Sequence, residues 1–180
     1  MKSTEFFTLG QQLFLRGNYA QSIRNFTHAI ASGVAGEKVY LPLGLAYFKN
    51  MEFSKAIENL SQVLEETPTN DKVLFLRGMA YFNDDQLDQA LNDFNLALRF
   101  NPRSASTYVA RSLAMRAMSR FEEAEFDLKS AIDIGGVEVE LFMREYCLTP
   151  RLHGLALTLF DAERSVWGRK LRNMQAQTIH

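Results

Sequence analysis

Residues 71–104 read DKVLFLRGMAYFNDDQLDQALNDFNLALRFNPRS, and this stretch decides the fold. In each half, apolar residues recur three and four positions apart, which is the spacing of one face of an α-helix. A short polar segment separates the halves, and Asn101-Pro102 ends the second half because proline cannot continue a helix. The stretch therefore predicts two antiparallel amphipathic helices joined by a short turn.

The same pattern recurs along the chain every 34 residues. Small residues form two of the series, which are Gly10, Gly44, Gly78 and Ser112, and Ser22, Ala56, Ala90 and Ala124. Large apolar residues form others, such as Phe26, Leu60, Phe94 and Leu128, or Leu13, Tyr47, Tyr81 and Met115. Small side chains let two helices approach closely, and each large side chain contributes about 1.5–3 kcal/mol when buried. The period predicts tandem repeats at residues 3–36, 37–70, 71–104 and 105–138.

The third repeat carries the residues of a known family pattern, which are Leu74, Gly78, Tyr81, Ala90, Phe94, Ala97 and Pro102. With this spacing, residues 3–138 resemble four tetratricopeptide repeats. The resemblance implies an all-α fold, a right-handed α-solenoid of helix-turn-helix repeats that serves protein–protein interaction. The chain departs from the pattern in having no tryptophan at the first aromatic position, and in having Arg77 and Arg111 where leucine is usual.

Helix ends follow from the turn residues. In the first repeat we expect helices at residues 4–16 and 19–31, separated by Gly17-Asn18. Gly33 and the Gly135-Gly136 pair should end the second helices of the first and fourth repeats. Pro42 falls in the second turn of a predicted helix, so we expect a local distortion or a late helix start there.

The repeat pattern stops after Glu138, so residues 1–138 and 139–180 form two predicted parts. Residues 139–148 read as a short helix, and residues 152–174 as a long amphipathic helix that carries Phe160, Trp167 and Leu171. Residues 151–180 hold five basic and two acidic side chains, a net charge of +3. This segment could cap the open face of the fourth repeat, as solenoids require, or could bind a partner.

The resemblance also implies a concave groove, lined by the first helix of each repeat at repeat positions 2, 5, 9, 12 and 13. We call these the groove positions. The binding residues expected from them are Phe7, Gln11, Phe14, Lys38, Leu41, Leu45, Phe48, Lys49, Lys72, Phe75, Met79, Phe82, Val109, Leu113 and Arg116.

Most of these residues are apolar, and a large apolar patch on a soluble protein usually marks a binding surface. We therefore expect a protein partner that inserts an apolar helix or extended peptide, with basic side chains at the edge. Two alternatives stay open for the groove. The residues could pack between helices, or residues 152–174 could lie in the groove. A structural subunit that self-associates or joins a larger complex is the alternative function.

Two family activities can be compared with the groove. Repeats that grip the acidic end of heat-shock chaperones need basic and amide side chains where this chain has Phe7, Gln11, Pro42 and Leu76, and only Lys72 fits. The apolar groove is more similar to that of the small tetratricopeptide chaperones of bacterial secretion systems, which hold hydrophobic client segments. That similarity is one of fold alone.

Composition and motifs argue against other function classes. The net charge of −1 and the absence of basic runs between aromatic residues argue against nucleic-acid binding. The single cysteine, Cys147, fits a reducing compartment, and neither a signal peptide nor a membrane-spanning run is recognisable. His28, His153 and His180 show no metal-binding spacing. We therefore expect a cytoplasmic, non-catalytic protein without a cofactor.

Overall fold

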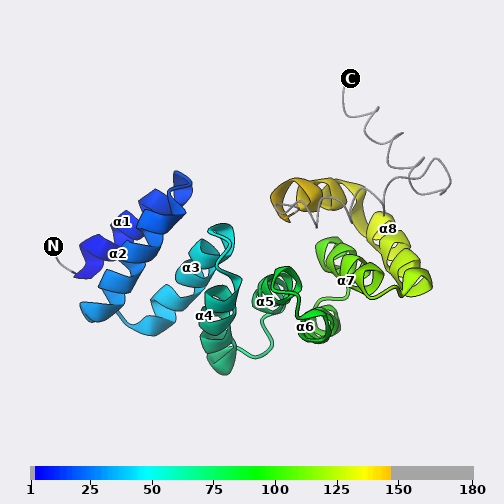
Figure 1. The fold of residues 1–180 in the computed structure, drawn as a ribbon, viewed down its shortest axis with the longest axis horizontal. Coiled ribbons are helices and arrows are strands. Elements are labelled where there is room, and N and C mark those ends of the chain that lie inside the picture. Colours follow the sequence, from blue (N-terminus) through cyan, green and yellow to red (C-terminus); the bar gives the residue numbers. More distant parts are fainter. Residues whose placement is uncertain (1–2, 147–180) are drawn as a thin grey trace, which may run out of the picture. The chain divides into compact units, whose positions relative to one another are not determined.

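The computed structural model describes residues 3–146, and the regular elements in this range are α-helices. They are α1 (Ser3–Leu15), α2 (Tyr19–Ala31), α3 (Gly36–Lys49), α4 (Phe53–Glu66), α5 (Asp71–Asn83), α6 (Leu87–Phe100), α7 (Ala105–Ala117) and α8 (Phe121–Tyr146) (Figure 1). The chain divides into two compact units, Met1–Gln89 and Ala90–His180, and the boundary falls within α6.

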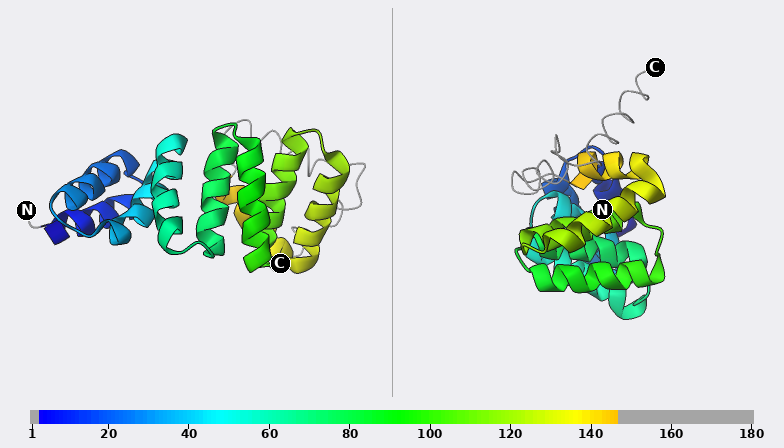
Figure 2. Two further views of the ribbon diagram at one scale, coloured as in Figure 1. Left: turned by 90° about the horizontal axis from the view of Figure 1, so that it is seen from below. Right: turned by 90° about the vertical axis from the view of Figure 1, so that its right-hand side faces the viewer.

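Helices that follow one another pack in pairs, as the period predicts. In the first unit α1 packs on α2, and α3 on α4, and α2 and α4 each contact the helix that follows; in the second unit α7 packs on α8 (Figure 2). The second helices of the four repeats begin at Tyr19, Phe53, Leu87 and Phe121, which are 34 residues apart. The all-α class and the helix-turn-helix repeats are confirmed.

The small-residue positions are points of close contact within a pair. A Cβ atom added to Gly10 would lie 2.7 Å from the ring of Phe26, and one added to Gly44 would lie 3.1 Å from Leu60. Ser22 replaces the usual alanine, and its Oγ donates to the carbonyl of Gly10 at 2.8 Å. These contacts hold α1 against α2 and α3 against α4 at the distance that the pattern requires.

In the fourth repeat a serine replaces the glycine itself. The Oγ of Ser112 on α7 donates to the carbonyl of Ala124 on α8 at 2.8 Å, and Ser112 is fully buried. Both serines that depart from the repeat pattern therefore form a hydrogen bond across their helix pair.

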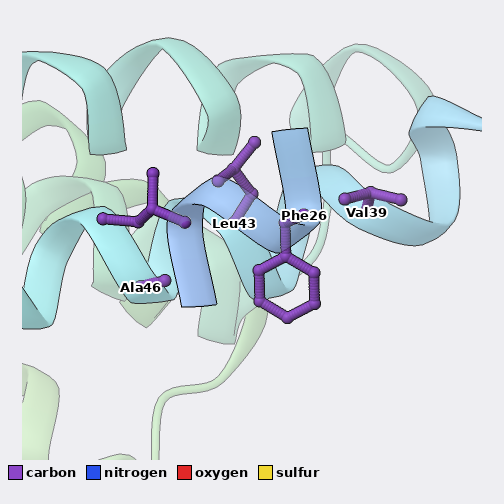
Figure 3. Close-up of a cluster of buried hydrophobic side chains, with 5 residues drawn as sticks. Phe26, Val39, Leu43 and Ala46 are labelled. Carbon is purple, nitrogen blue, oxygen red and sulfur yellow. The ribbon is translucent and has the colours of Figure 1, made fainter. Parts of the chain in front are cut away.

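The core of the first unit continues from one repeat to the next. Ile23 and Phe26 of α2 form a buried cluster with Val39, Leu43 and Ala46 of α3 (Figure 3). These α3 residues are three or four positions apart, so they lie on one face of the helix. The side of α3 that carries Pro42 and Leu45 is therefore not part of this cluster with α2.

Each first helix ends in the same hydrogen-bonded turn. In the first repeat the amide of Asn18 donates to the carbonyl of Leu13, and that of Gly17 to Phe14, each at 2.9 Å. The same two bonds recur in the other repeats, a Schellman motif that needs a left-handed residue. That residue is Gly17 (φ 76°), Met51 (φ 60°), Asp85 (φ 62°) or Ser119 (φ 61°). Only the first of these four is glycine.

The expectation of a distortion or a late start at Pro42 is wrong. The helix α3 begins at Gly36 and continues through Pro42 to Lys49. Proline removes one amide from the helix, so the carbonyl of Lys38 receives no hydrogen bond from position 42. Packing of Val39, Leu43 and Ala46 in the core stabilises the helix on both sides of the proline.

The ribbon labelled α8 consists of two helical segments. Gly135 between them has φ −176° and ψ 99°, outside the helical region. The predicted end of a helix at Gly135-Gly136 is confirmed, whereas the following helix begins directly after Gly135 instead of at Val139. Figure 1 shows the gold second segment turning back toward α7 instead of continuing away from it.

Arg111 joins three helices of the second unit. Its Nε and Nη2 donate to the carboxylate of Asp127 on α8 at 2.7 and 2.8 Å, and its Nη1 donates to Asn95 on α6 at 2.7 Å. The side chain of Asp127 is only 2% exposed. The hydrogen bond to Asp127 raises the pKa of Arg111 against the opposing effect of burial. The arginine at a leucine position is thus part of a buried ion pair.

The turn at Met51 gives a first prediction. The variant Met51→Gly should raise the free energy of unfolding by about 1 kcal/mol, because a side chain in the left-handed region costs about 1–2 kcal/mol. Little burial is lost, since Met51 is 60% exposed. Urea unfolding followed by circular dichroism measures the change. The matched control Gly17→Ala should lower stability by a similar amount, and a lower stability of Met51→Gly would contradict the prediction.

The ion pair gives a second prediction. Asp127→Ala should destabilise the chain by about 3–5 kcal/mol, because it leaves the Arg111 guanidinium without its buried partner. The double variant Arg111→Leu/Asp127→Ala should cost much less than Arg111→Leu and Asp127→Ala together, since neither charge then stays unpaired. Chemical unfolding of the four proteins measures the coupling. Additive losses would show that the pair contributes nothing specific.

Candidate functional site: a pocket between α1 and α3

The structure places the fifteen predicted groove residues in two classes. The residues that are half-buried or exposed are Phe7, Gln11, Phe14, Lys38, Leu41, Leu45, Lys49, Lys72 and Arg116. The residues that are buried are Phe48, Phe75, Met79, Phe82, Val109 and Leu113. The expectation of an open apolar lining is wrong for these six side chains. Binding by the other nine stays a prediction.

Position 12 of the repeat faces the neighbouring helix. The ring of Phe48 packs edge-on against Phe53 with centroids 5.7 Å apart, and Phe14 packs against Tyr19 at 5.5 Å. Both contacts join the end of a first helix to the start of the second helix in the same repeat. Phe82 occupies the same repeat position. The buried ring of Phe48 stabilises the repeat in this way and is not free to bind a partner, whereas the half-buried Phe14 is still partly exposed.

The helix α5 is buried on more than one face. Its buried residues are Val73, Leu74, Phe75, Gly78, Met79, Ala80 and Phe82. An amphipathic surface helix has a single apolar stripe, whereas a helix that is apolar on several faces packs on several sides. Phe75 and Met79 are therefore core residues here.

The fourth repeat is covered by the chain itself. Glu138, at the start of the second segment of α8, accepts hydrogen bonds from the backbone amide and the Oγ of Ser106 on α7, at 3.0 and 2.8 Å. Val139 and Phe142 of this segment are each 1% exposed, and Val109 and Leu113 of α7 are fully buried.

Nearby, Tyr146 stacks on Phe142 with centroids 5.4 Å apart, and burial raises the pKa of Tyr146 to about 12. The alternative that the chain's own end occupies this face was expected for residues 152–174. Along the described chain, the contact with α7 comes instead from the second segment of α8, through Glu138.

The first unit keeps an open pocket on the groove side of α1 and α3. Its volume is about 430 Å³. The lining residues are Thr8, Gln11, Gln12, Phe14, Leu15, Phe26, Pro42 and Leu45. Leu15 is 84% exposed, which is unusual for a large apolar side chain. Three of the predicted groove residues, Gln11, Phe14 and Leu45, meet in this pocket.

Helical spacing explains why these residues converge. On α1, Thr8, Gln11 and Leu15 are separated by three and four positions, so they form one stripe. On α3, Pro42 and Leu45 form the facing stripe, which continues to Lys38 at one end and Lys49 at the other. Lys38 is exposed and Lys49 half-buried. The pocket therefore has apolar walls, amide and hydroxyl groups on the α1 side, and a lysine one helical turn beyond each end of the α3 wall.

The groove mapping did not assign Thr8, Gln12 or Pro42 to the predicted binding residues. Thr8 and Gln12 are one helical turn apart on α1, beside the predicted Gln11. Pro42 was treated as a helix breaker, although its spacing to Lys38 and Leu45 places it on the same stripe. The spacing of three and four residues along α1 and α3 is the signal in the sequence that points to all three.

Other predicted features fall outside this site. The residues proposed for a C-terminal interaction helix, Phe160, Trp167 and Leu171, lie outside the described residues. Between residues 3 and 146, no group of histidine, cysteine or acidic side chains is arranged to hold a metal ion. Within that same range, no helix has the length and apolarity to cross a lipid bilayer.

Comparisons with known proteins agree with this fold. The family model of the tetratricopeptide repeat matches residues 71–104. The structure of MamA MSR-1 is similar with a TM-score of 0.69 and 26% identity, over 74% of this chain and 77% of that chain. YrrB, described as a tetratricopeptide-repeat protein with an unusual peptide-binding site, gives a TM-score of 0.69 and 22% identity, over 74% and 69%.

A third structure, residues 41 to the end of MamA from Desulfovibrio magneticus RS-1, gives a TM-score of 0.70 at 16% identity, over 73% of this chain and 75% of that chain. At such identities the likeness concerns the fold alone. A comparison with curated protein sequences found no match. Residues 71–104 therefore form a tetratricopeptide repeat, and the paired helices and these likenesses show the fold of a tetratricopeptide-repeat solenoid.

Proposed function

We propose that the chain is a non-catalytic protein-interaction module that binds an apolar helix or extended peptide in the pocket between α1 and α3. The observation that carries this proposal is an apolar pocket of about 430 Å³ with an exposed leucine at its edge. Covering a leucine side chain stabilises a complex by about 1.5–3 kcal/mol before association costs are subtracted. A partner that buries Leu15 and fills the pocket would gain this energy.

The family and the pocket support the same class of activity. YrrB has a peptide-binding site on the same fold, so the fold can present such a site. Adaptor, scaffold and client-holding chaperone are the roles that fit this activity. In the cell, the proposal places the protein in the cytoplasm, with a polypeptide partner and without a cofactor.

The pocket can be tested at Leu15, because an exposed side chain can be changed without loss of the fold. Peptides that bind the wild-type chain are selected from a displayed random library, and their affinities are measured by fluorescence anisotropy. Leu15→Asp should weaken binding at least tenfold, because a carboxylate then lines an apolar pocket. Variants at Phe48 or Phe82 would test folding instead, since both are 2% exposed.

Phe126→Asp is the matched control. Phe126 lies on α8, is 69% exposed and is not among the residues that line the pocket, so this variant makes the same change of an exposed apolar side chain to a carboxylate. The affinity of the Phe126→Asp variant for the selected peptides should equal that of the wild type. Equal binding by Leu15→Asp and the wild type, with helical circular dichroism unchanged in both, would refute the proposed site.

A structural subunit that self-associates is the alternative function, and one surface feature favours it. Val137 and Leu141 on the second segment of α8 are 64% and 46% exposed. They are four residues apart, so they form one apolar strip on that helix. If this strip is a subunit contact, sedimentation of the purified wild-type chain will show a concentration-dependent oligomer. The variant Val137→Asp/Leu141→Asp will then be monomeric, whereas a monomeric wild type at all concentrations rules the alternative out.

A further inference from the structure

The second segment of α8 shows what the groove face of a first helix in this chain accepts. Its Glu138 carboxylate binds the amide and hydroxyl of Ser106, which is groove position 2 of the fourth repeat. Val139 and Phe142, one and four residues later, are buried in the same unit as Val109 and Leu113 at groove positions 5 and 9. The segment therefore presents a carboxylate bound at groove position 2, followed along the same helix by buried apolar residues one and four positions later.

The second repeat presents the equivalent surface, and among the described residues of the first unit no such segment covers it. Two periods before the fourth repeat, groove positions 2, 5 and 9 are Lys38, Leu41 and Leu45. Lys38 is exposed, the two leucines are half-buried, and Leu45 lines the pocket. A lysine replaces the serine that holds the carboxylate of Glu138. An ammonium group attracts a carboxylate by charge as well as by hydrogen bonding, so this site favours the acidic group more strongly.

We infer that the α3 side of the pocket binds an amphipathic helix from another protein with the pattern of residues 138–142, an acidic residue followed by apolar residues one and four positions later. The acidic side chain pairs with Lys38, and the apolar pair covers Leu41 and Leu45. This inference rests on the proposed function and specifies the chemistry of the partner.

Two segments of the chain itself could in principle bind the α3 side of the pocket. One is disfavoured by its charge and the other already forms contacts within its own unit. Residues 151–180 have a net charge of +3, which is unfavourable beside Lys38 and Lys49. Residues 136–146 carry the matching pattern, but Glu138, Val139 and Phe142 are already engaged within their own unit. A second copy would have to release this segment before it could donate it. A separate acidic, amphipathic helix meets neither obstacle.

The experiment uses a labelled synthetic peptide with the sequence of residues 136–146, GVEVELFMREY, and the full chain. Anisotropy should show binding that Lys38→Glu weakens about tenfold, because an attraction becomes a repulsion. A peptide in which the residue equivalent to Glu138 is lysine should bind the wild type weakly and recover its affinity for Lys38→Glu. The control Lys55→Glu reverses an exposed lysine on α4 and should leave both affinities unchanged.

Each other outcome has a definite meaning. No binding of the peptide, or binding that Lys38→Glu does not weaken, overturns the inference. A wild-type dimer that Lys38→Glu dissociates in sedimentation also overturns it, because the occupant is then a second copy. Library peptides that lack acidic residues but lose binding to Leu15→Asp overturn this inference and leave the proposed function standing.

Discussion

The close approach of two helices at a pair of small residues is the constraint on which the rest of the structure depends. A Cβ atom at Gly10 would lie within 2.7 Å of Phe26, so the aromatic ring fills the space that the glycine leaves open. Where serine replaces a small residue, its Oγ bonds to the carbonyl of the facing helix, as Ser22 does with Gly10. This spacing fixes how each pair is assembled and thereby which side of each first helix is left for binding.

The sequence was sufficient for the helix pairs because the interactions that define them are local and periodic. The starts of the second helices follow the period, and α2 and α6 end next to Gly33 and Asn101-Pro102 as expected. At Pro42 the low helix propensity of proline is outweighed by core packing on the other face of α3, so the helix continues where a distortion or a late start was expected. Left-handed turns at Met51, Asp85 and Ser119 carry no glycine, but Gly17 marks the position, since the three turns follow it by one, two and three periods.

The candidate site was predictable only in part. A repeat position tells on which side of the helix a residue lies, but it does not tell which other residues pack against that side. Position 12 faces the second helix of the repeat, where Phe48 meets Phe53. In the fourth repeat the same position is Arg116, whose guanidinium lies 5.4 Å from the ring centroid of Phe121. The contact on α7 comes from Glu138, the last residue of the fourth repeat, which has no counterpart contact in the repeat pattern, so no periodic argument could supply it. The pocket beside Leu15 exists because α1 and α3 lie at a certain distance from each other. The residue pattern along one helix does not give this distance.

Arginine at the leucine position of the third and fourth repeats shows how one repeat can be tied to the one before it. Arg77 donates to Ser61 at 3.0 Å, and Arg111 donates to Asn95 at 2.7 Å. Ser61 and Asn95 are one period apart, so both arginines reach the same position of the preceding second helix. The first two repeats carry no arginine at this position, and there the open pocket lies between α1 and α3. The polar contacts between repeats and the apolar pocket are therefore found at different repeats of the chain.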